Sequence, residues 1–168
     1  MKLSTRTRYG LRLLTALASA YGGKPVFLKD IAGSQEISEK YLSLIVIPLR
    51  AAGLITSVRG AHGGYCLARA PGMIRLLQVI EALEGDICLV DCVQHPSSCS
   101  RAAGCPARDF WSSLSAKIKA SLNKTTLAEL IKKKNSPGAK ITKGSLKNGN
   151  CGKNKNNAAG KKRGNSGS

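Results

Sequence analysis

Apolar residues recur at steps of three and four near the start of the chain, and this spacing predicts an amphipathic helix. The helix is expected over residues 5–21, with Leu14, Ala18 and Tyr21 continuing one face. The glycine pair at residues 22–23 then ends it, because glycine weakens helical backbone. The same stretch is too interrupted for a signal peptide, since a charged residue, Arg12, breaks the apolar run.

Two shorter helices are expected over residues 28–34 and 38–52, with Ser38 as the cap of the second. Residues 54–58 and 64–67 have the composition of strands, and the glycine-rich stretch between them predicts a hairpin. Two short helices joined by a tight turn and followed by a hairpin make a winged helix-turn-helix.

In the second half of the chain, one helix is expected before a long loop and two helices after it. A fourth helix is expected over residues 73–83, and residues 86–105 are interpreted as a loop. Pro106 is suited to open a long helix, and Thr126 with Glu129 fits a capping box for a short last one. The apolar stripe of the long helix consists of Phe110, Trp111, Leu114, Ile118 and Leu122. Little else in the chain can bury this stripe, so a homodimer is expected, with packing inside one chain as the alternative.

The predicted fold class is therefore mainly α, a winged helix-turn-helix domain with a two-stranded wing and a long dimerisation helix. The expected parts are a winged helix-turn-helix DNA-binding domain (1–84), a cysteine-bearing sensor loop (85–107), the dimerisation helix with the terminal helix (108–134) and a disordered basic tail (135–168).

Charge favours a polyanionic partner. The net charge is +18; residues 1–131 contain 16 Lys and Arg against 9 Asp and Glu, and residues 132–168 contain 11 against none. Such a balance suits nucleic acid, because neutralised phosphates release counterions, although the charge also serves solubility. No apolar run approaches the ~20 residues of a membrane span, so a cytoplasmic protein without membrane contact is expected. Enzymatic activity is not expected, since paired carboxylates, a phosphate loop and a serine–histidine arrangement are missing.

The third helix and the hairpin hold the candidate contacts to double-stranded DNA. Leu42, Ile45, Val46 and Leu49 should pack inward, which leaves Ser38, Lys40, Tyr41, Ser43 and Leu44 as candidate DNA-binding residues on the opposite face. Ile47 is expected on that face too, where it and Leu44 could contact thymine methyl groups. Ordinary helical amphipathicity explains the apolar side equally well. On the hairpin, Arg59, Gly60 and His62 are the candidates, with Arg59 expected to enter a minor groove. The alternative for Arg59 is a solvated side chain.

Three cysteines, Cys92, Cys99 and Cys105, lie within the predicted loop. A flexible loop can wrap three thiolates around a soft metal, although the spacing differs from the paired cysteines of a zinc ribbon. A fourth ligand would have to come from elsewhere, and inert buried cysteines or a redox thiol pair are the alternatives.

The stretches MKLSTRTRYGLR, ISEKYL, GLITSVRGAHGGY, ALEG and TLAEL, in this order and with the three cysteines, resemble the Rrf-two (Rrf2) family of winged-helix transcription regulators, in its iron–sulfur type. The resemblance covers residues 1 to about 131. It implies a homodimer with crossed long helices, a palindromic operator, and an iron–sulfur cluster (2Fe-2S or 4Fe-4S) bound by Cys92, Cys99 and Cys105.

The chain departs from family members at two ligand positions. Arg108 stands where some members have a ligating histidine, and Arg8 stands where some nitric-oxide sensors have an acidic ligand. The resemblance therefore implies a regulator, expected to be a repressor, whose operator binding depends on a cluster that senses nitric oxide, oxygen or iron–sulfur status. A cluster-free regulator that senses a metabolite, a partner protein or thiol oxidation is the alternative.

Overall fold

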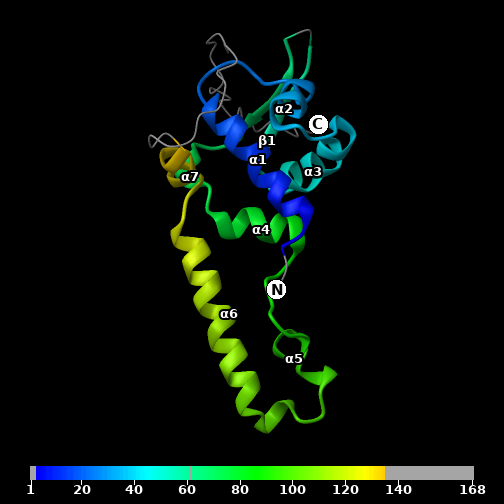
Figure 1. Ribbon diagram of the computed structural model, residues 1–168, viewed down its shortest axis with the longest axis vertical. Helices are drawn as coiled ribbons and strands as arrows, with labels where there is room; N and C mark the ends of the chain where they lie inside the picture. Colours follow the sequence, from blue (N-terminus) through cyan, green and yellow to red (C-terminus); the bar gives the residue numbers. More distant parts are fainter. Residues whose placement is uncertain (1–2, 61, 135–168) are drawn as a thin grey trace, which may run out of the picture.

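The computed structural model describes residues 3–60 and 62–134, and the tail predicted as disordered lies outside them. The helices are α1 (Thr5–Ser19), α2 (Leu28–Gln35), α3 (Glu39–Ala51), α4 (Leu76–Glu84), α5 (Asp91–Gln94), α6 (Pro106–Lys124) and α7 (Leu127–Lys134). The strands are β1 (Ile55–Val58) and β2 (Gly64–Leu67), and three 3₁₀ turns are η1 (Pro71–Met73), η2 (Pro96–Ser98) and η3 (Ala102–Gly104). Figure 1 shows α1 to α4 and the wing gathered at one end, with α6 leaving them as a long arm.

Helix α1 crosses the centre of the core. The Ser4 side chain caps it by accepting a hydrogen bond from the Thr7 backbone N–H at 3.3 Å. Leu13, Leu14 and Leu17 are fully buried, as helical spacing predicted. The helix ends at Ser19, so the prediction that it reaches Tyr21 was wrong: the backbone turns at Ala20, and the Tyr21 side chain is 47% exposed.

Helix α3 buries Leu42, Ile45, Val46 and Leu49, and this confirms the predicted inward face. Ser38 occupies the N-cap position as predicted, but its side chain makes no capping hydrogen bond. The helix therefore starts without the side-chain cap that the sequence suggested.

The wing is an antiparallel hairpin in which Ile55 pairs with Leu67 and Val58 with Gly64. Val26 and Tyr65 exchange backbone hydrogen bonds of 3.0 and 2.8 Å, and this pair attaches the hairpin to the segment before α2. Gly64 has a φ of 136°, and a Cβ at this position would lie 2.5 Å from the Val26 carbonyl oxygen. Glycine is therefore required where the two backbones meet.

The fourth helix was predicted over residues 73–83, and this start was wrong because α4 begins three residues later, at Leu76. Met73 ends the turn η1 with its side chain 65% exposed, and α4 starts at Leu76. Between them Ile74 is extended and fully buried, and its carbonyl accepts the Leu127 N–H at 2.9 Å. Residues 74–76 pair with the backbone at the start of α7, which keeps Ile74 extended, so that α4 can begin only at Leu76.

Helix α7 returns the chain from the arm to the core. The Thr126 hydroxyl accepts the Glu129 backbone N–H at 3.3 Å, which confirms one half of the predicted capping box. The Glu129 carboxylate accepts from the Thr126 hydroxyl at 3.0 Å, whereas the other half of the box would use the Thr126 backbone N–H. Leu127 is fully buried in the core cluster, with Leu130 and Ile131 packed against it. The long helix α6 is thus held at its C-terminal end by the winged-helix core.

Candidate DNA interface and cysteine segment

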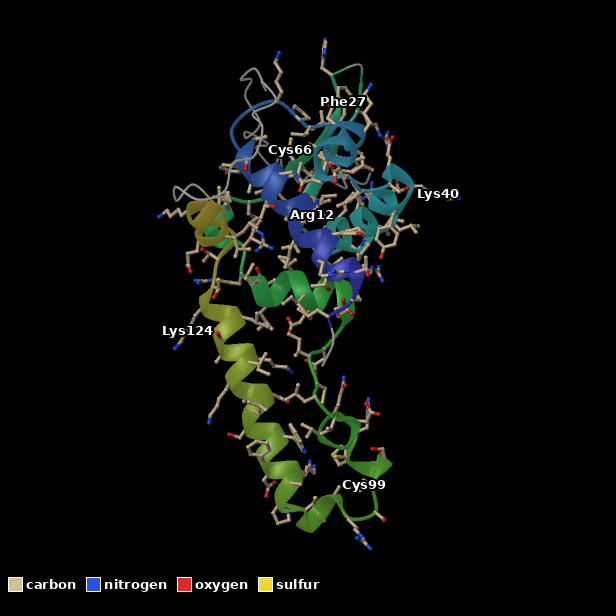
Figure 2. All side chains as sticks on the ribbon, in the orientation of Figure 1. Arg12, Phe27, Lys40, Cys66, Cys99 and Lys124 are labelled. Atoms are coloured by element: carbon tan, nitrogen blue, oxygen red, sulfur yellow. The ribbon has the colours of Figure 1, made fainter. Side chains whose placement is uncertain are left out.

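The outward face of α3 carries the five residues predicted to read DNA. Lys40, Ser38, Ser43 and Leu44 are exposed and Tyr41 is half-buried. Two large apolar side chains stand in solvent, Leu44 at 56% exposure and Ile47 at 59%. Figure 2 shows Lys40 directed away from the body of the molecule. The Ser43 hydroxyl donates to the Glu39 carbonyl at 3.0 Å, so part of its hydrogen-bonding capacity is used within the helix.

An open groove of about 740 Å³ runs beside this face. Its lining combines Ser38, Lys40, Tyr41 and Leu44 with Thr5 and Tyr9 from α1, and with Glu36 and Ile37 from the turn before α3. Tyr9 and Tyr41 meet edge to face with ring centroids 5.8 Å apart. Neither Thr5 nor Tyr9 was predicted to lie at this face. Only their place on the first turns of α1 could have indicated them, because the packing of α1 against α3 is a tertiary contact.

The first helix also carries cations close to this groove. The guanidinium carbons of Arg8 and Arg12 lie 6.0 and 5.7 Å from the Tyr9 ring centroid. Arg12 is held in place by hydrogen bonds to the side chain and the backbone carbonyl of Gln35. Helix α1 therefore presents positive charge beside the Tyr9–Tyr41 pair, next to the groove along the outward face of α3.

Arg59, Gly60 and His62, the candidate DNA contacts on the hairpin, are exposed. Gly60 has a φ of 113°, and its carbonyl accepts the Gly63 N–H at 2.9 Å. A Cβ on Gly63 would lie 2.4 Å from the Val58 carbonyl oxygen, so the turn tolerates only glycine there. Arg59 therefore lies exposed at the end of β1, next to glycines that the backbone requires.

Residues 86–105, here called the cysteine segment, were predicted to be a loop, and this prediction was wrong in detail. The segment folds into α5, η2 and η3, three short turns joined by extended residues. Cys92 lies in α5, Cys99 lies between η2 and η3, and Cys105 is the N-cap of α6. Figure 2 places Cys99 near the end of the arm, away from Lys40.

The cysteines supply the right donor type for iron but are not gathered. Cys88, Cys92, Cys99 and Cys105 are free, half-buried thiols. Within residues 3–60 and 62–134, no three His, Cys, Asp or Glu side chains are placed to hold one metal ion. The thiol chemistry therefore fits an iron–sulfur cluster, whereas the positions in this structure do not form its ligand cage.

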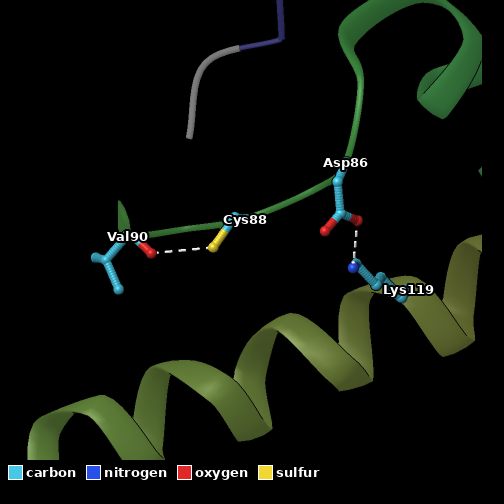
Figure 3. A network of polar contacts seen from close by, with 4 residues as sticks. All are labelled: Asp86, Cys88, Val90 and Lys119. Atoms are coloured by element: carbon cyan, nitrogen blue, oxygen red, sulfur yellow. Dashed lines mark hydrogen bonds and ion pairs between the residues drawn. The ribbon is translucent and has the colours of Figure 1, made fainter. Parts of the chain in front are cut away.

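The cysteine segment is attached to α6 by polar contacts. Asp86 accepts from the Lys119 ammonium at 2.5 Å, and this hydrogen bond holds the pKa of Asp86 below its usual value (Figure 3). The Cys88 thiol donates to the Val90 carbonyl at 3.0 Å (Figure 3). Arg108, which stands where some relatives have a ligating histidine, donates to the carbonyls of Cys92 and Ala102.

A second polar contact joins the end of α4 to the start of α1. One oxygen of the Glu84 carboxylate accepts from the Ser4 N–H, the Ser4 hydroxyl and the Thr7 hydroxyl. Burial raises the pKa of Glu84, but these hydrogen bonds and the charge of Arg6 outweigh it and lower the pKa overall. Glu84, two residues before the cysteine segment, is thereby bound to the start of α1, the helix that lines the α3 groove.

Helix α6 exposes aromatic residues. Phe110 is 61% and Trp111 37% exposed, and their rings meet edge to face with centroids 5.1 Å apart. Leu114, Ile118 and Leu122 are half-buried, and Ser115 is the one buried residue of the helix. The predicted apolar stripe is therefore incompletely covered within one chain.

A winged helix-turn-helix with an exposed recognition face defines the chain as a DNA-binding regulator of transcription, and comparison with known proteins gives the family. Residues 3–133 match the Rrf2 model, described as an iron-dependent transcriptional regulator. The chain belongs to the Rrf2 family.

Three relatives illustrate the range of this family. Protein rrf2 of Nitratidesulfovibrio vulgaris is 43% identical over 132 residues, which are 79% of this chain and 88% of that protein. The regulator CymR of Bacillus subtilis is 39% identical over 130 residues, 77% of this chain and 89% of that protein. IscR of Cereibacter sphaeroides is 38% identical over 142 residues, 82% of this chain and 91% of that protein.

The structure of B. subtilis CymR, described as a global cysteine regulator, superposes with a TM-score of 0.67 at 38% identity and covers 79% of this chain and 98% of that one. The winged-helix fold is thus confirmed. No described helix, within residues 3–60 and 62–134, is both long and apolar enough to cross a membrane.

Proposed function

We propose that this Rrf2-family regulator binds a palindromic operator as a homodimer and acts as a repressor. The main support for DNA binding by α3 is the exposure of Leu44 and Ile47 beside Lys40 on this second helix of the helix-turn-helix. Apolar side chains at this place can contact thymine methyl groups, while Lys40, Ser38 and Tyr41 can reach phosphates or base edges. Arg59 at the end of the wing would add a minor-groove contact.

The homodimer is supported by the uncovered face of α6. Phe110 and Trp111 expose aromatic surface at the N-terminal part of a helix whose other end is anchored in the core. A two-fold partner would bury this surface and set the separation of the two recognition helices. For winged-helix dimers this separation is about one turn of DNA, which explains why a palindrome would be read.

For the sensor, we propose that Cys92, Cys99 and Cys105 hold an iron–sulfur cluster. The cluster would supply thiolate-ligated iron, which reacts with oxidants and nitric oxide. The support is the donor set: three free, half-buried thiols within one short segment of a chain related to IscR. Cys88, Asp91, His95 and Asp109 lie in or beside the same segment and are candidates for a fourth ligand.

Two observations favour a second candidate, a cluster-free thiol switch or metabolite sensor. The cysteines as placed do not converge, and the chain is as similar to CymR as it is to IscR. In both cases the signal would act as a population shift, because the cysteine segment joins α4 at one end and α6 at the other. A change in its conformation would alter the position of α6 relative to the recognition helices.

The experiment starts with selection of binding sites from random duplexes, followed by operator titration with the protein purified without oxygen. The proposal expects an inverted repeat with half-site centres about 10 base pairs apart. Replacing Cys92, Cys99 and Cys105 together by serine should leave DNA binding of the folded dimer possible but abolish its response to nitric oxide. Selection of no duplex sequence would contradict the DNA-binding proposal. A serine variant that still responds would contradict the sensor proposal alone.

A further inference from the structure

The side chain of Arg108 reaches from the first turn of α6 back across the cysteine segment. Its Nε donates to the Cys92 carbonyl at 3.0 Å, and its Nη1 donates to the Ala102 carbonyl at 3.4 Å. Its backbone N–H donates to the Cys105 carbonyl at 3.0 Å. Arg108 therefore binds the segment at α5, at η3 and at its junction with α6.

The chemistry of arginine suits this arrangement. A guanidinium is a planar fork with several donors in fixed directions, so it can bind two carbonyl oxygens at once without leaving its rotamer. Hydrogen bonds from an ionised donor are stronger than neutral ones, and the half-buried position of Arg108 limits competition from water. Both acceptors are backbone atoms, so the contact organises the course of the chain and leaves the thiols unoccupied.

Few other side chains bind the cysteine segment to the rest of the protein through hydrogen bonds. Among the residues that the structure describes, Arg108 and Lys119 are the two side chains outside the cysteine segment that donate hydrogen bonds to it. Lys119 binds Asp86, at the very start, whereas Arg108 binds the part that contains Cys92 and leads to Cys105. The other hydrogen bonds found for the described residues of the segment are those within its short turns, the contact of Cys88 with Val90, and the backbone bonds from the first turn of α6 to the Cys105 carbonyl.

We infer that Arg108 is a clasp that keeps the cysteine segment folded when no metal is bound, and thus a positioning residue for Cys92 and Cys105. The guanidinium connects α5 and η3 through the Cys92 and Ala102 carbonyls, as a metal would connect the segment through its thiolates. The clasp depends only on the fold of one chain, and it holds whether the sensor uses a cluster or bare thiols.

Hydrogen exchange of the full chain, purified free of iron, tests this inference without DNA. In Arg108→Gln the backbone amides of residues 91–104 should exchange about tenfold faster or more, because charged hydrogen bonds that close the segment are lost. Arg101→Gln is the matched control: it removes the same charge from an exposed side chain of the segment for which no hydrogen bond is found in the described part of the chain. It should leave the exchange unchanged.

Arg108→Lys distinguishes the effect of bridging two carbonyls from the effect of positive charge, because it keeps the charge but has a single ammonium group. A single ammonium cannot span both carbonyls, so this variant should exchange like Arg108→Gln. Labelling of the thiols with an alkylating reagent should also become faster at Cys92 and Cys105 in both variants, and not at Cys88, whose own contact to Val90 is intact.

Three results would overturn the clasp. The first is unchanged exchange in Arg108→Gln, and the second is full protection in Arg108→Lys, which would make charge alone responsible. The third is faster exchange throughout α1 and α3, which would show a loss of global stability in place of local opening. Since neither iron nor an operator takes part, each result is independent of the proposed function.

Discussion

At the scale of the residue, Arg59 offers the sharpest test of the DNA surface. It is exposed at the end of β1, beside a turn built from glycines. Arg59→Ala should weaken operator binding by about 1–3 kcal/mol, because a groove contact and its counterion release are both lost. Titration at moderate salt, by fluorescence anisotropy, measures the change. Arg101→Ala is the control for charge in the cysteine segment, and equal affinity of the two variants would rule out the groove contact.

Glu84 gives a prediction for pH. Its pKa is lowered from 4.5 in the folded protein, so its charged form stabilises the fold above that value, and the contribution is lost as the pH falls through the lowered pKa. Glu84→Gln should therefore destabilise the protein near neutral pH, by less than about 1 kcal/mol because the carboxylate is largely solvated.

Urea unfolding at about pH 7 and about pH 3 checks this, since the difference from the unmodified protein should shrink at the lower pH. Glu81→Gln, on an exposed position of the same helix, is the control. A difference that persists unchanged in acid would show that the charge of Glu84 has no part in the contact with Ser4 and Thr7.

Residue-scale features that depend on one helix were predictable from sequence, and those that depend on two elements were not. The buried face of α3 follows from spacing alone, and the capping of α7 by the Thr126 hydroxyl follows from two residue types three apart. The contact of Tyr9 with Tyr41 depends on the packing of α1 against α3. The carboxylate of Glu84 likewise meets residues 77 and 80 positions away in sequence.

At the scale of the element, α7 is the part on which the position of the arm depends. Leu127→Ala should destabilise the protein by about 2–5 kcal/mol, because the side chain is fully buried where α7 meets the core. Thermal and chemical unfolding measure the loss. Met73→Ala, at a side chain 65% exposed, should change stability little. A small loss at Leu127 would mean that α7 is not anchored as described.

Element types were predicted well, whereas two boundaries and one segment were not. Ile74 was included in the predicted fourth helix, but its backbone pairs with the start of α7. Pairing between residues so far apart in sequence leaves no local pattern from which it could be predicted. The turns α5, η2 and η3 are each three or four residues long, too short for periodicity to detect. Their contact with Arg108 is visible only once α6 is placed beside them.

At the scale of the whole molecule, the exposed aromatic pair on α6 predicts a dimer. Replacing Phe110 and Trp111 together by serine should raise the dimer dissociation constant by a factor of about 30 or more, since buried aromatic residues contribute strongly to interfaces. Light scattering and sedimentation measure the oligomeric state. Met73→Ser, which alters exposed apolar surface away from α6, should leave the dimer intact. A double variant that dimerises as before would place the interface elsewhere.

Binding of an iron–sulfur cluster by Cys92, Cys99 and Cys105 is tested by the visible absorption and iron content of protein purified without oxygen. An absorbance at about 400 nm with about two to four irons per chain is expected, and both should be lost when the three cysteines are replaced by serine. Colourless, iron-free protein that still binds DNA after attempted reconstitution would contradict it and favour the thiol or metabolite switch.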